Sequence, residues 1–282
     1  MNQKYNGTLY VIATPIGNLQ DISIRAINTL QKVDLIAAEN IQHTKNLLRN
    51  FKINKKIISL HIHNENQKIP QLIEILKKKK IALVSNAGTP TINDPGYQLV
   101  KMCHKNHIII HPIPGPCAAI SALSASGISN KKFCYEGFIP KKKTERINFL
   151  KKISKKSKTT ILYESCHRIL KTMQDIDLII GNKKNIVIAK EITKKWEKIK
   201  YGKPIEILSW LKNDKYGEKG EIVIIIEGEK KKKKIFSSKI FNTFLILKQE
   251  LSTKTSIKLT ASIYKINKND LYKFIIKNMT NN

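Results

Sequence analysis

The sequence has no segment long and apolar enough to cross a membrane, and no sign of an export signal. Its longest aliphatic run is Ile222–Ile226, whereas a membrane-spanning helix needs about 20 apolar residues. The amino-terminal segment lacks an uninterrupted apolar core and a small-residue cleavage site. We therefore expect a soluble protein that stays in the cytoplasm.

Cysteine is scarce and widely spaced. The four cysteines, Cys103, Cys117, Cys134 and Cys166, form no CxxC pair, which argues against a zinc ribbon, a redox dithiol or a disulfide framework. The histidines also lack a carboxylate or cysteine at metal-ligand spacing. We therefore expect no metal site, and we interpret the cysteines as small buried hydrophobic residues in a reducing compartment.

Three common signatures of ligand binding are missing as well. The sequence contains no GxGxxG after a strand, no GxxxxGK[ST] and no GxSxG. These absences argue against ordinary Rossmann dinucleotide binding, P-loop chemistry and a hydrolase nucleophile elbow.

Arginine is scarce although the chain is strongly basic. The formal net charge is +31, but only four of the 52 basic residues are arginine. The lysines are scattered, whereas a nucleic-acid groove usually shows a stripe rich in arginine. A+T-rich codon usage explains part of the excess. The remainder favours a polyanionic partner, because so positive a field attracts phosphates at long range.

What the sequence does contain is an alternation of apolar strands with amphipathic helices. Strands that are apolar on both faces predict an α/β fold with a mostly parallel sheet covered on both sides. The predicted strands are 8–13, 34–38, 57–60, 81–84 and 108–111, and the predicted helices are 22–33, with Asp21 as N-cap, 67–80 and 96–105.

A second α/β unit and a helical tail follow. The second unit has predicted helices at 117–125 and 144–156 and predicted strands at 133–138, 160–163, 186–190 and 221–227. The lysine run 230–234 predicts a linker, and three short helices are predicted at 240–251, 256–266 and 270–278. The expected domains are therefore 1–115, 116–229 and a tail at 236–282.

Four turn segments follow strand ends, and proline and glycine concentrate in three of them. Glycine lets a backbone approach a ligand closely, and ligands of open α/β sheets bind at strand carboxyl ends. As a set, the turns predict a ligand held mainly by main-chain groups. They are TPIGNL (14–19), NAGTPTINDPG (86–96), PIPGPCAAISALSASG (112–127) and YESCHR (163–168).

These segments resemble the tetrapyrrole-methylase-type (class III) methyltransferases. Within that family the chain is similar to enzymes that 2′-O-methylate a cytidine ribose in the decoding centre of 16S rRNA. The resemblance runs from about residue 8 to 273 and also includes LYVIATPIGNLQDIS, SNAGTPTINDPGY, KEITKKWE and GEIVIIIEG. It implies two α/β domains with S-adenosylmethionine in the cleft between them, a helix-turn-helix-like tail, 16S rRNA in the small ribosomal subunit as partner, and a homodimer.

The resemblance also implies which residues contact the cofactor. These are Pro15, Gly17, Ser85, Asn86, Ala87, Gly88, Thr89, Pro90, Ile92, Ser121, Ala122, Tyr163 and Glu164.

Methyl transfer needs alignment of the ribose hydroxyl and a base that takes its proton. Glu39 and His43 are the candidate bases. Lys190, Glu191 and Lys194 are candidates for orienting the nucleotide or stabilising the developing alkoxide. The candidate RNA contacts are Arg168, Lys190 and Lys194. The candidate catalytic residues are Glu39, His43 and Glu191.

The chain departs from the family pattern at three positions. Asn40, Gln42 and Asn86 stand where the family has Asp, Arg and Asp, and asparagine keeps an acceptor oxygen but loses the charge. Two alternatives therefore remain beside the RNA methyltransferase: a tetrapyrrole (precorrin-type) methyltransferase and a non-catalytic ribosome-binding assembly factor. The intact YESCHR and KEITK segments and the helical tail favour RNA.

Overall fold

The computed structural model describes residues 7–214, 220–229 and 237–279. The chain divides into two compact units, residues 1–229 and residues 230–282. Across the described residues, no helix has the length and apolar character needed to span a membrane.

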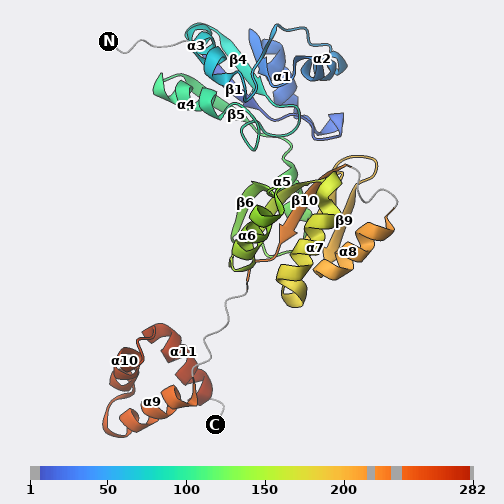
Figure 1. Ribbon diagram of the computed structural model, residues 1–282. Coiled ribbons are helices and arrows are strands. Elements are labelled where there is room, and N and C mark those ends of the chain that lie inside the picture. The colour runs from blue at the N-terminus through green and yellow to red at the C-terminus, as the bar shows by residue number, and fades with distance from the viewer. Residues whose placement is uncertain (1–6, 215–219, 230–236, 280–282) are drawn as a thin grey trace. The chain divides into compact units, whose positions relative to one another are not determined.

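The first sheet consists of five parallel strands in the order β3-β2-β4-β1-β5, of which β1, β4 and β5 are labelled in Figure 1. Each neighbouring pair is parallel, which confirms the predicted parallel sheet. The carboxyl ends of the strands therefore lie at one edge, where the predicted turns meet. The strands are β1 (Thr8–Ile12), β2 (Leu35–Ala38), β3 (Ile57–Ser59), β4 (Lys80–Val84) and β5 (Ile109–Ile113).

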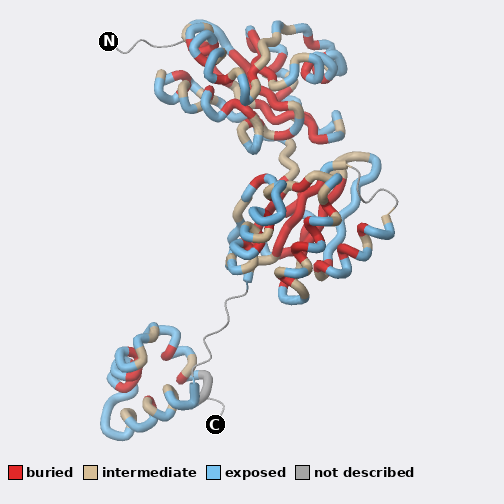
Figure 2. Tube along the Cα trace, viewed as in Figure 1, coloured by how far each residue is buried: buried red, intermediate tan, exposed pale blue. Residues whose placement is uncertain are grey.

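Helices cover both faces of this sheet. Helices α1 (Ile24–Lys32) and α2 (Ile41–Asn50) share one apolar core with it, and α3 (Glu65–Leu76) and α4 (Tyr97–Lys105) share the core on the other face. Figure 2 shows the strands buried and the outer sides of the helices exposed.

Two details of this region differ from the sequence-based prediction. Asp21 is not the N-cap of α1. It belongs to a preceding 3-10 turn, Leu19–Asp21 (η1), and Ser23 caps α1 by accepting a hydrogen bond from the Ala26 amide at 3.1 Å. Helix α2 was not predicted. It begins after Asn40, whose side chain accepts a hydrogen bond from the His43 amide at 3.0 Å.

The second sheet is mixed, with the order β6-β7-β10-β8-β9. Only β6 and β7 pair in parallel, and the other neighbours are antiparallel. The strands are β6 (Phe133–Phe138), β7 (Thr159–Ser165), β8 (Ile186–Lys190), β9 (Lys198–Gly202) and β10 (Glu221–Ile226).

The two faces of the second sheet are covered unequally. Helices α6 (Lys143–Ser154), α7 (Ile169–Ile180) and α8 (Pro204–Asn213) pack on one face, and the eight-residue α5 (Ala118–Ala125) packs on the other. Short 3-10 turns, η2 (Cys166–Arg168) and η3 (Gly181–Lys183), flank α7. The sequence predicted α5 and α6 but not α7, α8 or β9.

The helical tail, which forms the compact unit 230–282, is a set of three helices with its own core. Helices α9 (Ser238–Glu250), α10 (Thr253–Ile263) and α11 (Lys268–Met279) bury Phe244 and Leu271 together with three further apolar side chains. The three predicted tail helices are thus confirmed. The predicted lysine linker at 230–234 lies outside the described residues.

Candidate functional site

The turns that follow β1 and β4 are joined into one floor. The Thr14 amide donates to the Gly88 carbonyl at 2.9 Å, and the Gly88 amide donates to the Thr14 carbonyl at 3.0 Å. Gly88 has a φ of +77°, and a Cβ there would lie 3.3 Å from Cγ2 of Ile16. Because few side chains adopt that φ, glycine suits this position. The floor lies at the carboxyl ends of parallel strands, where such sheets bind ligands.

A cavity of about 480 Å³ opens above this floor. Its volume lies within the range of small-molecule sites. On the side of the first sheet, the lining consists of Glu39 and of residues 86–89 and 92–94. The second sheet's side contributes Cys117, Ala118, Phe138 and the segments 163–167 and 220–223.

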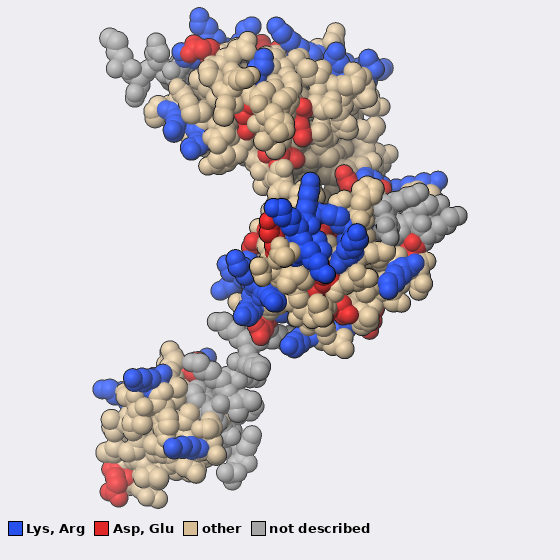
Figure 3. Space-filling model, viewed as in Figure 1, with Lys and Arg blue, Asp and Glu red and all other residues tan. Residues whose placement is uncertain are grey.

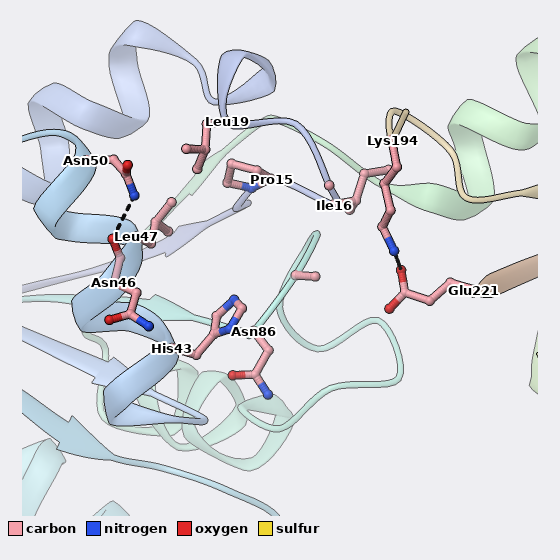
Figure 4. A pocket seen from close by; sticks show the side chains of 12 residues that line it. Pro15, Ile16, Leu19, His43, Asn46, Leu47, Asn50, Asn86, Lys194 and Glu221 are labelled. Carbon is pink, nitrogen blue, oxygen red and sulfur yellow. Dashed lines mark hydrogen bonds and ion pairs between the residues drawn. The ribbon is translucent and has the colours of Figure 1, made fainter. Parts of the chain in front are cut away.

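A second cavity of about 380 Å³ adjoins the larger one. Figure 4 shows the side chains that line it. The two share part of their lining, namely Ile16, Asn86, Ala87 and Glu221. Helix α2 contributes one wall of the smaller cavity through His43, Asn46, Leu47 and Asn50, and Pro15, Gly17, Leu19 and Lys194 complete it. The arrangement can therefore hold two ligands in contact with each other.

Asn86 stands at the boundary between the cavities. Its backbone amide donates to Oε2 of Glu39 at 3.2 Å. Its side-chain oxygen is buried and has no hydrogen-bond partner among the described residues. A buried acceptor without a partner is costly, so this oxygen is suited to a donor group on a bound ligand.

Glu164 is held rigidly in the wall of the larger cavity. The residue is only 2% exposed. One carboxylate oxygen accepts hydrogen bonds from Arg168 at 2.5 Å and the Ser165 amide at 2.6 Å, and the other accepts from Thr172 at 2.6 Å. The charge of Arg168 is thus neutralised by Glu164 inside the domain, which does not favour its predicted role as an RNA contact.

Tyr163 and Asp94 complete the larger cavity. The Tyr163 hydroxyl accepts a hydrogen bond from the Ala119 amide at 3.1 Å, and its ring meets that of Tyr135 edge-on. Burial raises the pKa of Asp94 to about 6, with Glu39 adding to the rise and a hydrogen bond from Ser85 opposing it. Asp94 was not predicted, although it lies in the NDPG turn that the sequence singles out.

Lys194 closes one side of the smaller cavity (Figure 4). Its ammonium lies 2.9 Å from Oε1 of Glu191 and 3.0 Å from Oε2 of Glu221. Burial acts to lower the pKa of Lys194, but the two carboxylates outweigh it and raise the pKa. Burial likewise acts to raise the pKa of Glu191, but hydrogen bonds from the Glu221 amide and Lys194 lower it overall. A carboxylate with a lowered pKa is a weak base, so Glu191 serves to anchor Lys194.

Several other predicted residues do not reach a cavity. Lys190 is 3% exposed and its ammonium lies 3.3 Å from Asp214 inside the domain. Ala122 is fully buried between α5 and the second sheet, and Ser121 lines neither cavity. Ala118, one turn earlier in α5, lines the larger cavity instead. Ser85 and Pro90 are buried and line neither cavity.

The three departures from the family pattern have different surroundings. Asn40 caps α2, and Gln42 donates to the Asn46 side chain at 3.2 Å on the exposed face of that helix. Neither lines a cavity, whereas Asn86 lines both. The predicted bases also separate, because Glu39 lines the larger cavity and His43 the smaller one.

The expectation that all four cysteines are buried was wrong. Cys103 is buried, but Cys117, Cys134 and Cys166 are partly exposed. Cys117 and Cys166 line the larger cavity.

Known proteins resemble the chain over almost all of its length. Residues 8–207 match the family model described as Tetrapyrrole (Corrin/Porphyrin) Methylases. A ribosomal RNA small subunit methyltransferase I from Buchnera aphidicola subsp. Acyrthosiphon pisum is 54% identical, covering 98% of this chain and 99% of the relative. The Escherichia coli O157:H7 protein of that name is 47% identical, covering 96% and 95%. A crystal structure of diphthine synthase shares the fold at 15% identity, with a TM-score of 0.59, covering 78% of this chain and 90% of that one. The chain therefore belongs to the tetrapyrrole methylase family, and within it to the ribosomal RNA small subunit methyltransferase I group.

Proposed function

We propose that the chain transfers a methyl group from S-adenosylmethionine to the 2′-hydroxyl of a cytidine ribose in the decoding centre of 16S rRNA. The small ribosomal subunit is the substrate in this proposal, which includes a cytoplasmic homodimer. The observation that supports it most is the pair of adjoining cavities with a common boundary at residues 86–87. A methyl donor and its acceptor must touch, and two cavities that share a wall allow this.

The larger cavity fits the cofactor by its chemistry. S-adenosylmethionine supplies, when bound, an electrophilic methyl group on a positively charged sulfur. Glu39 and Asp94 place carboxylates in the lining, and Ile92, Phe138 and Tyr163 add apolar surface for a ring system. The unpartnered oxygen of Asn86 can accept a hydrogen bond from the ligand.

The smaller cavity suits a nucleotide. The Asn46 side-chain oxygen accepts from Gln42, and the Asn50 side-chain nitrogen donates to the Asn46 carbonyl. The other halves of these two amides, the Asn46 nitrogen and the Asn50 oxygen, can pair with a base edge. Leu19 and Leu47 offer apolar contact to the faces of the rings. His43 is exposed at this cavity, where its imidazole can take the proton of the ribose hydroxyl.

The tetrapyrrole alternative is less well supported by this cavity. A tetrapyrrole carries several carboxylates and would need cations to bind them. Lys194 supplies the only lysine or arginine among the described lining residues, and its ammonium is already shared by Glu191 and Glu221. The assembly-factor alternative leaves the larger cavity without a role.

Calorimetry with S-adenosylmethionine tests the cofactor half of the proposal. We expect one site per chain in the wild-type protein and no binding in Gly88→Val, because a branched side chain would enter the floor beside Ile16. Gly127→Val is the matched control. Gly127 has a similar φ of +66°, but a Cβ there meets nothing within 4 Å.

The control separates backbone strain from occupation of the site. Gly127→Val should lose thermal stability, as Gly88→Val does, yet keep cofactor affinity. Equal loss of affinity in both variants, or wild-type affinity in Gly88→Val, would move the cofactor site elsewhere. Methylation of small subunits that lack the modification, assayed with the same three proteins, tests the substrate half.

A further inference from the structure

A continuous exposed segment begins at the rim of the smaller cavity. Lys194 lines that cavity, and every residue from Lys195 to Tyr201 is exposed. The segment continues from a tight turn into β9, the outer strand of the second sheet. The exposed segment therefore adjoins the smaller cavity through Lys194.

The segment combines positive charge with exposed aromatic rings. Residues 194–203 contain five lysines and a single carboxylate, Glu197. Trp196 is 58% exposed and Tyr201 is 52% exposed. The Lys195 ammonium lies 5.1 Å from the centre of the Trp196 ring. Figure 3 shows lysine and arginine side chains gathered over the second α/β region.

The pairing of β9 with β8 sorts these side chains by face. Lys198 and Lys200 lie opposite Lys190 and Ile188, whereas Ile199 and Tyr201 lie opposite Ala189 and Val187. Successive side chains of a strand alternate between faces. Cations therefore follow one side of the strand and apolar groups the other. Lys198 is partly neutralised by Asp214 at 3.0 Å, which leaves Lys195 and Lys200 as the cations to test.

We propose that residues 195–201, here called the β9 surface, bind the single-stranded RNA that flanks the target nucleotide, with Trp196 stacking on a base and Lys195 and Lys200 contacting phosphates. Aromatic rings beside a positively charged track are the usual means of holding a single strand. The proposal rests on the proposed function and specifies how its substrate is held.

An outer strand can also pair with the same strand of a second copy of this chain, but the charge of β9 disfavours such pairing. Pairing two β9 strands would bring their lysines together, in a protein whose net charge is +31. Like charges facing one another across a strand pair are destabilising. A polyanion instead gains from the same charges, because its counterions are released on binding.

The test compares Trp196→Ala, Trp196→Phe and the double variant Lys195→Ala/Lys200→Ala with the wild-type protein. Binding to unmodified small subunits is measured over a series of KCl concentrations. Lys151→Ala/Lys152→Ala removes two exposed lysines from α6 and serves as the charge-matched control. Cofactor affinity, melting temperature and sedimentation are recorded for every protein, so that unfolding or a change in association is recognised.

We expect Trp196→Ala to weaken binding about tenfold, the scale of one lost stacking contact, and Trp196→Phe to restore most of it. The β9 lysine pair should reduce the slope of log affinity against log salt by about 1.5, since each phosphate contact contributes roughly 0.7 to 0.9. The α6 pair should leave that slope unchanged. Cofactor affinity should stay at the wild-type value in all variants.

Three results would overturn the proposal. If folded β9 variants bind and methylate subunits like the wild-type protein, the RNA lies elsewhere although the proposed function stands. If the β9 variants change sedimentation and leave RNA affinity intact, the surface joins two copies. If the wild-type protein neither binds nor methylates subunits, the proposed function fails and this inference fails with it.

Discussion

The side chain of Lys194 lies directly against the backbone of Gly17. A Cβ at Gly17 would lie 2.4 Å from Cγ of Lys194 and 3.0 Å from Oγ1 of Thr193. Gly17 and Lys194 both line the smaller cavity. The turn that carries Lys194 can therefore close over the turn after β1 only because residue 17 has no side chain.

Gly17→Ala should consequently lower the rate of methylation while sparing cofactor affinity. The added methyl group pushes Lys194 away from the smaller cavity, whereas the larger cavity does not include Gly17. In a Lys194→Ala background the same substitution should cost less, because the clashing Cγ is gone. A double-mutant cycle on rates measures this coupling, and strictly additive effects would contradict the contact.

Arg168→Met should destabilise the protein by about 3 kcal/mol or more, because it leaves the buried Glu164 carboxylate without its cation. Adding Glu164→Gln should recover part of the loss, since the amide carries no charge to compensate. Denaturant unfolding measures both effects. Unchanged stability together with a smaller salt dependence of RNA binding would instead support the RNA contact predicted from the sequence.

Asp94→Asn should raise the melting temperature at pH 7.5 and leave it nearly unchanged at pH 3.5. The pKa of Asp94 is raised to about 6 by burial, above its ordinary value of 3.8. The folded protein therefore binds this proton more tightly than the unfolded chain, and stability is lost as pH rises from about 4 to 6. Asparagine mimics the protonated form and removes the loss. An equal shift of the melting temperature at both pH values would show that titration is not the cause.

Removing the helical tail, residues 230–282, should leave the cofactor site intact. Residues 237–279 have a core of their own around Phe244 and Leu271. A chain ending at residue 229 should bind S-adenosylmethionine like the full protein but methylate subunits more slowly, if the tail helps to dock RNA. Collapse of cofactor affinity, measured by calorimetry, would show instead that the tail supports the cavity.

The parallel sheet was predictable because its strands are buried on both faces. Leu35–Ala38 and Ile81–Val84 are wholly apolar runs, and only a sheet covered on both sides leaves no place for polar residues. Strand β9 shows the opposite case. It lies at the outer edge of its sheet with four of its five residues exposed, so Lys198–Gly202 carries no apolar signal.

The cavities were predictable only in part, because the residues that complete each cavity are brought there only by the tertiary fold. The turns after β1 and β4 are marked by proline and glycine, and the structure brings Pro15, Gly17 and 86–89 together as expected. Helix α2 places Asn46 and Asn50 at the smaller cavity through its cap at Asn40 and its packing at Leu48. Neither asparagine carries a local signal of function, since both read as ordinary residues of an exposed helix.

Identification of the methylated nucleoside shows directly whether the chain methylates a ribose of 16S rRNA. Small subunits that lack the modification are incubated with the protein and labelled S-adenosylmethionine, and the 16S rRNA is digested to nucleosides for mass spectrometry. We expect one labelled methyl group per subunit, on the ribose of a decoding-centre cytidine, and no label with Gly88→Val. Label on a base, or a protein that binds the cofactor and folded subunits yet transfers no label, would contradict it.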